Sequence, residues 1–128
     1  MTDFSNLADE KKPSETPEAR ANETFRRIKQ HQAAGRHDAA MVLLDDLLQE
    51  HPGNVRLQHY KGMNLILMGR KDEGRAIMEA ALAMAPEDPL QLCDLASHLA
   101  ENGELDKATE YFETAVEVAP DYAIARSN

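Results

Sequence analysis

The sequence repeats itself every 34 residues, and this period constrains the fold more than any other feature. Three segments, 21–54, 55–88 and 89–122, align without gaps. Each places a glycine, an aspartate three residues later and a proline fourteen residues after that in matching columns: Gly35, Gly69 and Gly103; Asp38, Asp72 and Asp106; Pro52, Pro86 and Pro120. A unit of this length cannot bury an apolar face alone, so the pattern predicts a solenoid whose neighbouring units pack on each other.

Each segment reads as two amphipathic helices joined by a tight turn. In the third segment Leu92, Leu95 and Leu99 recur at helical spacing, and Phe112 and Ala115 continue the period after a polar break. The glycine column is expected to end each first helix, because glycine adopts positive φ without steric cost, and the proline column is expected to end each second helix. The aspartate column is expected to open the second helix, because a carboxylate at or near the first turn can accept backbone N–H bonds and lies favourably against the helix dipole.

A further column near the start of each second helix holds only small residues, as a close helix crossing requires. Seven residues later the second and third segments again have an alanine, but the first segment has Leu47. This predicts a splayed or differently packed first hairpin. The small residues are Ala40, Gly74 and Ala108, followed by Ala81 and Ala115 in the second and third segments.

Residues 21–122 resemble the tetratricopeptide repeat, a family of helical protein-binding modules. The resemblance implies an all-α fold: a right-handed superhelical stack of three helix-turn-helix repeats, an α-α solenoid. The match is fullest in the third segment and weakest in the first, and no repeat carries the family's favoured tryptophan. The third segment's matching residues are Leu92, Leu95, Ala96, Leu99, Gly103, Ala108, Phe112, Ala115 and Pro120.

The regions outside the repeats differ in kind. Residues 1–20 are polar, contain two prolines and lack apolar periodicity, so we expect a disordered tail, and residues 123–128 form a short C-terminal tail. No apolar run suits a signal peptide or a membrane span. The single cysteine, Cys93, excludes an internal disulfide and agrees with a reducing compartment. The expected location is cytoplasmic.

The net charge of −9 is concentrated in the C-terminal third of the chain. Residues 89–128 carry two basic and eight acidic side chains. Binding to a phosphate backbone needs clustered lysine and arginine, so nucleic acid is not expected as a partner. The acidic end is expected to be a solvated face, with an electrostatic docking patch as the alternative.

The resemblance implies that the first helices line a concave groove, whose residues share one face at spacings of three and four. The centre of this groove is apolar, which suits a peptide or an amphipathic helix from another protein. For Leu67 and Leu90 the alternative is a place in the core between repeats. The predicted groove residues are Phe25, Lys29, Arg56, His59, Met63, Ile66, Leu67, Leu90, Cys93 and Ser97.

Two other binding or catalytic modes are disfavoured. The family's carboxylate clamp for chaperone tails would need its lysines, asparagines and arginine at the positions of five residues that do not match them: Phe25, Lys29, Tyr60, Leu90 and Asp94. The one pair with catalytic character is Cys93 and His59, in equivalent columns of adjacent repeats. No phosphate loop, paired-carboxylate motif or metal-ligand cluster accompanies it, so we expect a non-enzymatic adaptor or co-chaperone-like module without cofactor or metal.

The C-terminal end suggests a second function. Only six residues follow the third repeat, which is too few for a stable covering helix. The face around Leu105, Phe112, Val116 and Tyr122 is therefore expected to be partly bare. A bare apolar face indicates a partner, a second copy of the chain, or a longer parent protein. The alternative function is a self-assembling homo-oligomeric scaffold that associates through this face.

Overall fold

The computed structural model describes residues 16–127, and within that range every regular element is an α-helix. The all-α class predicted from the sequence is confirmed. The chain divides into two compact units, one ending at Pro52 and one beginning at Gly53.

The first unit is a helical hairpin of α3 (Pro17–Ala33) and α4 (His37–Glu50). Helix α3 begins inside the segment that was predicted to be disordered, so the prediction is wrong for residues 17–20. A capping interaction explains this start: the side-chain oxygen of Thr16 accepts a hydrogen bond from the backbone N–H of Ala19 at 3.1 Å, and Pro17 suits a first helical position. The rest of the predicted tail, residues 1–15, lies outside the described residues.

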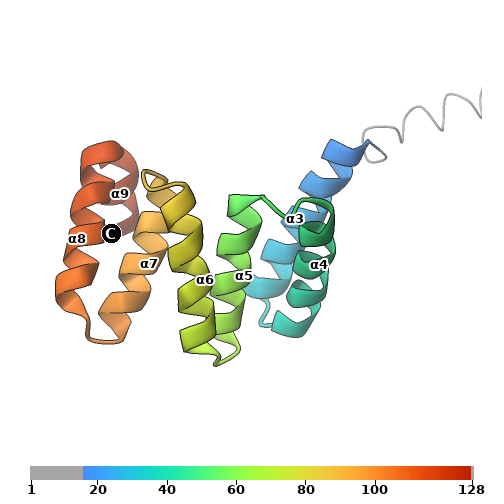
Figure 1. Cartoon of the computed structure of the whole chain (residues 1–128), viewed down its shortest axis with the longest axis horizontal. Coiled ribbons are helices and arrows are strands. Elements are labelled where there is room, and N and C mark those ends of the chain that lie inside the picture. Colours follow the sequence, from blue (N-terminus) through green and yellow to red (C-terminus); the bar gives the residue numbers. More distant parts are fainter. Residues whose placement is uncertain (1–15, 128) are drawn as a thin grey trace, which may run out of the picture. The chain divides into compact units, whose positions relative to one another are not determined.

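The second unit contains five helices in which each pair of neighbours along the chain makes contact (Figure 1). Two hairpins, α5–α6 and α7–α8, correspond to the second and third repeats. The last helix, α9, contacts both α7 and α8. The helices are α5 (Val55–Leu67), α6 (Lys71–Met84), α7 (Pro89–Glu101), α8 (Leu105–Val118) and α9 (Pro120–Ser127).

The glycine column ends the first helix of each repeat, as predicted. Gly35, Gly69 and Gly103 have φ values of 79°, 92° and 84°, in the left-handed region that glycine tolerates best. The residue after each glycine donates its backbone N–H to a carbonyl one and a half turns back, as Glu104 does to Leu99 at 2.9 Å. Each turn is therefore a Schellman motif, which satisfies carbonyls that the helix end leaves free.

The aspartate column lies in the first turn of each second helix, as predicted, but no side-chain capping bond starts these helices. The capping positions are Arg36, Arg70 and Glu104, none of which makes a side-chain capping bond, and the aspartates lie inside the first turn. There they still oppose the positive end of the helix dipole. Capping side chains instead start the first helices of the second unit: Asn54 accepts from Leu57 at 2.9 Å, and Asp88 accepts from Leu90 at 3.0 Å.

The small-residue column brings α5 and α6 into backbone contact. A Cβ placed on Gly62 would lie 2.7 Å from the carbonyl oxygen of Gly74 and 2.6 Å from Cγ of Met78. A Cβ on Gly74 would lie 2.9 Å from the backbone nitrogen of Ile66 and would also strike the Gly62 carbonyl oxygen. Neither position can hold a side chain without moving one helix away from the other.

The first hairpin is packed differently, in line with its larger residues. Ile28 and Ala40 occupy the positions of Gly62 and Gly74, and both are fully buried. Leu47, which the sequence marked as exceptional, is also buried, and α3 and α4 contact each other less extensively than α5 and α6 do.

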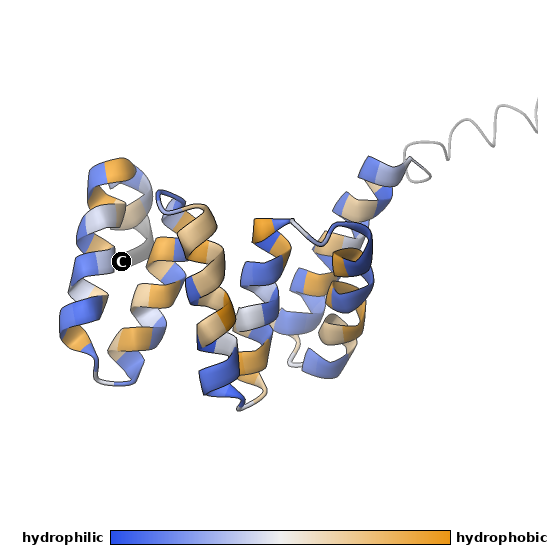
Figure 2. Ribbon diagram, viewed as in Figure 1, coloured by the Kyte–Doolittle hydropathy of each residue, from blue (hydrophilic) through white to orange (hydrophobic). Residues whose placement is uncertain are grey.

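The main core of the second unit lies among α6, α7, α8 and α9. Met78, Leu92, Leu95 and Leu99 are almost fully buried there, and α9 contributes Ala123. Hydrophilic and apolar residues alternate along α8, as expected of a helix with one face on this core (Figure 2).

The prediction that no covering helix follows the third repeat is wrong. Helix α8 ends at Val118, and Pro120 begins α9 rather than only terminating the helix before it. The covering segment therefore contains eight residues, and contact with α7 and α8 stabilises a helix that would be too short to persist alone.

Candidate functional site: a hollow beside α5 and α7

A hollow of about 190 Å³ lies between the first helices of the second and third repeats. One wall, from α5, is apolar, and the opposite wall, from α7, is polar. Small-molecule pockets usually measure about 300–1,000 Å³, so this hollow better suits a single large side chain. The lining residues are Met63, Ile66, Leu67, Met78, Asp94, Ser97, His98 and Glu101.

The apolar wall combines anchored and exposed side chains. Met63 and Ile66 are partly buried and pack against the core cluster. Leu67, at the end of α5, is 52% exposed. An exposed leucine beside two half-buried apolar residues gives a partner side chain apolar surface to cover.

The polar wall is held by a contact between repeats. Nε2 of His59 on α5 lies 2.9 Å from Oδ2 of Asp94 on α7, and both side chains are nearly buried. This bond joins the first helices of the second and third repeats and fixes the Asp94 carboxylate at the hollow.

A second polar group of the wall, His98, is buried on α7. Its Nε2 lies 3.0 Å from the amide nitrogen of Asn102, one helical turn further on. Burial lowers the pKa of His98, and the positive charge of Arg75 lowers it further. The ring therefore favours the neutral form, in which Nε2 can accept the hydrogen bond from Asn102.

An ion pair joins α6 to the start of α8. Arg75 donates through both terminal nitrogens to the two carboxylate oxygens of Glu104, and its Nε donates to Glu79 at 3.3 Å. The hydrogen bond from Arg75 lowers the pKa of Glu104. A bidentate pair fixes both position and orientation, so it sets the register between the second and third repeats.

Four of the predicted groove residues do line the hollow: Met63, Ile66, Leu67 and Ser97. Whether a partner binds there stays a prediction. Leu90 is partly buried at the start of α7, and Arg56 is exposed in the first turn of α5.

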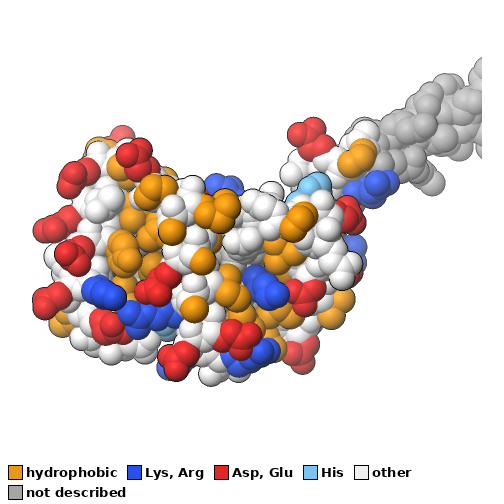
Figure 3. Space-filling model, in the orientation of Figure 1, with side chains coloured by type: hydrophobic (Ala, Val, Ile, Leu, Met, Phe, Trp, Pro, Cys, Tyr) orange, Lys and Arg blue, Asp and Glu red, His pale blue; other side chains and the backbone are white. Residues whose placement is uncertain are grey.

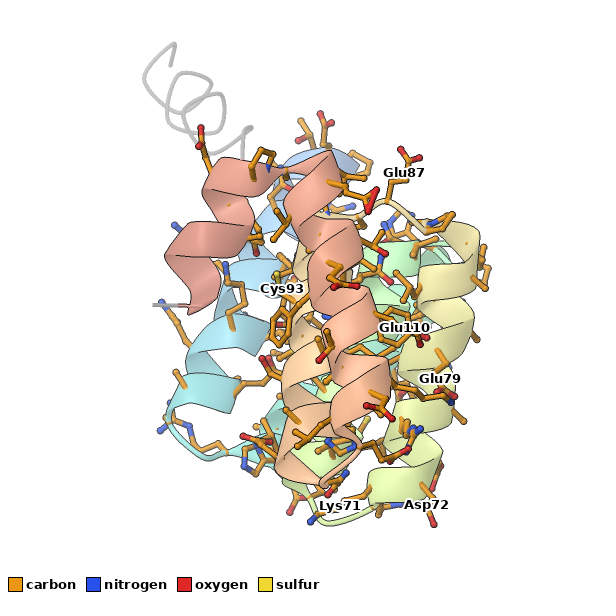
Figure 4. All side chains as sticks on the ribbon, turned by 90° about the vertical axis from the view of Figure 1, so that its left-hand side faces the viewer. Lys71, Asp72, Glu79, Glu87, Cys93 and Glu110 are labelled. Atoms are coloured by element: carbon orange, nitrogen blue, oxygen red, sulfur yellow. The ribbon has the colours of Figure 1, made fainter. Side chains whose placement is uncertain are left out.

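Two predicted groove residues are instead in the interior. His59 is fully buried, where it bonds Asp94, and Cys93 is 1% exposed within the core cluster. Figure 4 shows Cys93 inside the helical body. Both side chains are buried, so neither is open to a partner protein.

The remaining predicted groove residues, Phe25 and Lys29, lie on α3 in the first unit. Lys29 places Nζ 5.8 Å from the centre of the Phe25 ring, a cation–π arrangement.

Sequence reasoning did not predict that Asp94 lines the hollow. It entered only as a mismatch to the carboxylate clamp, and His98 was not among the predicted site residues. Their positions in the repeat could have indicated that they lie near the groove. Asp94 follows the Cys93 column by one residue, and His98 lies four residues further along the same helix. Their roles depend on how α7 is rotated against α5, which periodicity alone does not give.

The predicted self-association face is partly open. Leu105 and Val116 are exposed, whereas Phe112 and Tyr122 are half-buried and pack against the core. Within residues 16–127, no group of three or more His, Cys, Asp or Glu side chains is placed to hold a metal ion. No helix in that same range is long and apolar enough to cross a membrane.

Comparison with known families agrees with this architecture. Two family models, each described as a tetratricopeptide repeat, match residues 31–92 and 92–122. No curated protein matches the chain. Tetratricopeptide repeats are generally protein–protein interaction modules and are typically not enzymes. With matches that together span most of its length, the chain belongs to the tetratricopeptide repeat family.

Proposed function

We propose that this protein is a non-enzymatic adaptor that captures a segment of another protein at the hollow between α5 and α7. The observation that carries this proposal is the exposed Leu67 beside a hollow sized for one large side chain. The captured segment is a peptide or an amphipathic helix that places an apolar anchor against Met63 and Leu67.

The polar α7 wall indicates which kind of residue lies next to the apolar anchor in the ligand. Asp94 and Glu101 supply carboxylates, and Ser97 supplies a hydroxyl. A lysine or arginine of the ligand, next to the apolar anchor, suits this hollow. Its aliphatic stem can cover apolar surface of the α5 wall, and its charged group can remain at the rim near the carboxylates of the α7 wall. The proposed ligand is therefore an apolar segment with a basic residue beside the anchor, unlike the acidic chaperone tails that the family's carboxylate clamp binds.

The test is a selection of binding peptides from a random library, followed by affinity measurement on variants. Leu67→Glu is the sharpest substitution, because Leu67 is half exposed and the helix can tolerate the change. Ile66→Glu is less clean, since Cγ1 of Ile66 packs 2.8 Å from where a Cβ on Gly74 would lie. We expect Leu67→Glu to weaken binding by at least tenfold, as removing a buried leucine contact costs about 1.5–3 kcal/mol.

Met84→Glu is the matched control. Met84 ends α6, is 59% exposed and does not line the hollow. It should leave the affinity unchanged. Equal affinity of the wild-type and Leu67→Glu proteins for the selected peptides would move the site elsewhere.

A further inference from the structure

The outer side of α8 repeats, 34 residues later, a surface that α6 uses to hold its neighbour. On α6, Met78 and Leu82 are buried in the core cluster to which α7 contributes most. The residues 34 positions on are Phe112 and Val116, which form a ridge because they are four apart on a helix. Phe112 is only partly buried and Val116 is 46% exposed, so the surface that is closed on α6 is open on α8.

Helix α9 covers only part of this surface. It buries Ala123 in the cluster and packs Tyr122 against it. An open depression of about 630 Å³ remains along α8, much larger than the hollow beside α5 and α7. Its lining residues on α8 are Thr109, Phe112, Glu113, Val116 and Glu117.

The depression is acidic as well as apolar. Glu113 and Glu117 form a second ridge beside Phe112 and Val116, and acidic side chains gather over α8 at the left of Figure 3. Figure 4, which looks onto α8, shows Glu110 as a further carboxylate of the same helix. In all, α8 carries four carboxylates, Asp106, Glu110, Glu113 and Glu117, against one lysine, Lys107.

Comparison with α6 indicates that a partner of the α8 face carries positive charge. On α6 the glutamate matching Glu113 is Glu79, and Arg75 bonds both Glu79 and Glu104 of the next repeat. On α8 the position of Arg75 is taken by Thr109. The arginine that neutralises this surface in the second repeat is thus missing from the third.

We propose that the outer face of α8 binds a basic amphipathic helix of another protein, laid along the part of α8 that α9 leaves open. Apolar residues spaced three and four apart would cover Phe112 and Val116 by ridge-into-groove packing. Lysines or arginines beside them would pair with Glu113 and Glu117, in the role that Arg75 has on α6. This face is separate from the hollow beside α5 and α7, so the protein has two docking surfaces.

A second copy of the chain fits this face less well. Symmetric pairing would set Glu113 and Glu117 of the two copies against each other, and like charges facing across an interface are unfavourable. The basic helix α3 of another copy offers Arg26, Arg27 and Lys29, but no large apolar side chain in its described residues is exposed to cover the ridge.

The test uses two labelled synthetic helices with identical leucine positions, one with lysines on the flanking positions and one with glutamates there. We expect the lysine peptide to bind in fluorescence anisotropy and to weaken as salt is raised, and the glutamate peptide not to bind. Glu113→Lys combined with Glu117→Lys should weaken the lysine peptide roughly tenfold and allow the glutamate peptide to bind. Val116→Asp, at an exposed position, should weaken the lysine peptide while circular dichroism stays unchanged.

Two controls separate this site from the hollow and from net charge. Glu50→Lys combined with Glu87→Lys makes the same change in charge at exposed positions that are not on α8 and should not invert the preference. Leu67→Glu should leave peptide binding to α8 intact. Absent or equal binding of the two peptides would overturn the proposal. So would a dimer in light scattering that Val116→Asp dissociates, because the occupant would then be a second copy.

Discussion

The hairpins α3–α4 and α5–α6 occupy equivalent positions in the repeat but cross in different ways. At the matching positions, the first hairpin buries Ile28 and Ala40, whereas the second has Gly62 and Gly74 with their backbones in contact. The repeat therefore fixes where two helices cross, and the volume of the residues at that point fixes how near they come. Because α5 carries the apolar wall of the hollow, the glycine crossing also sets where that wall lies.

The largest predicted effect breaks the glycine crossing. Gly74→Ala places a methyl group against the Gly62 carbonyl oxygen and the Ile66 backbone, which cannot move aside as a flexible side chain would. We expect a loss of about 1–3 kcal/mol or more in the free energy of unfolding, measured by chemical denaturation. Gly53→Ala is the control, since a Cβ there meets nothing within 4 Å, and it should leave stability nearly unchanged. A Gly74→Ala protein as stable as the wild type would contradict the close approach of the two helices.

A smaller predicted effect, on the pH dependence of stability, concerns a difference between the second and third repeats. The column that holds buried Asn64 in the second repeat holds His98 in the third. The folded-state pKa of His98 is lowered, mainly by burial. As the pH falls below about 6.5, the unfolded chain binds a proton that the folded chain does not, so His98 makes the folded state less stable.

His98→Asn copies the residue of the second repeat and should remove that contribution. We expect the difference in Tm between about pH 8 and about pH 5 to shrink in this variant. The lowered pKa of Glu104 acts in the same sense, but only below its ordinary pKa of about 4.5, so it falls outside this window. An unchanged Tm difference would mean that His98 titrates alike in the folded and unfolded chains.

The 34-residue period predicted the hairpins because the residues that end and begin their helices act within a single hairpin. A glycine with positive φ, such as Gly69, is specified by the turn itself, and the small column at Gly74 by a crossing within one hairpin. The aspartate column was correctly placed near the first turn, but its bonds to backbone N–H groups were not found, because a carboxylate inside the first turn and one at the cap look alike in sequence. The start of α9 at Pro120 was missed for a similar reason, since proline can end one helix or begin the next.

The site was less predictable because it depends on contacts between repeats. Met63, Ile66 and Leu67 were predicted from the family resemblance together with helical spacing, and they line the hollow. The burial of His59 and its bond to Asp94 involve residues 35 positions apart and depend on the rotation of α7 against α5. Such a contact leaves no signal in the spacing of apolar residues.

The central claim is that a partner segment places its anchor in the hollow between α5 and α7. Methyl NMR on the protein with a selected peptide tests it most directly. We predict that the methyl signals of Met63, Ile66 and Leu67 shift on titration, while that of Ile77 on α6, which does not line the hollow, stays in place. Shifts confined to Ile77 or to Val116 on α8, with the three hollow residues unchanged, would contradict the account.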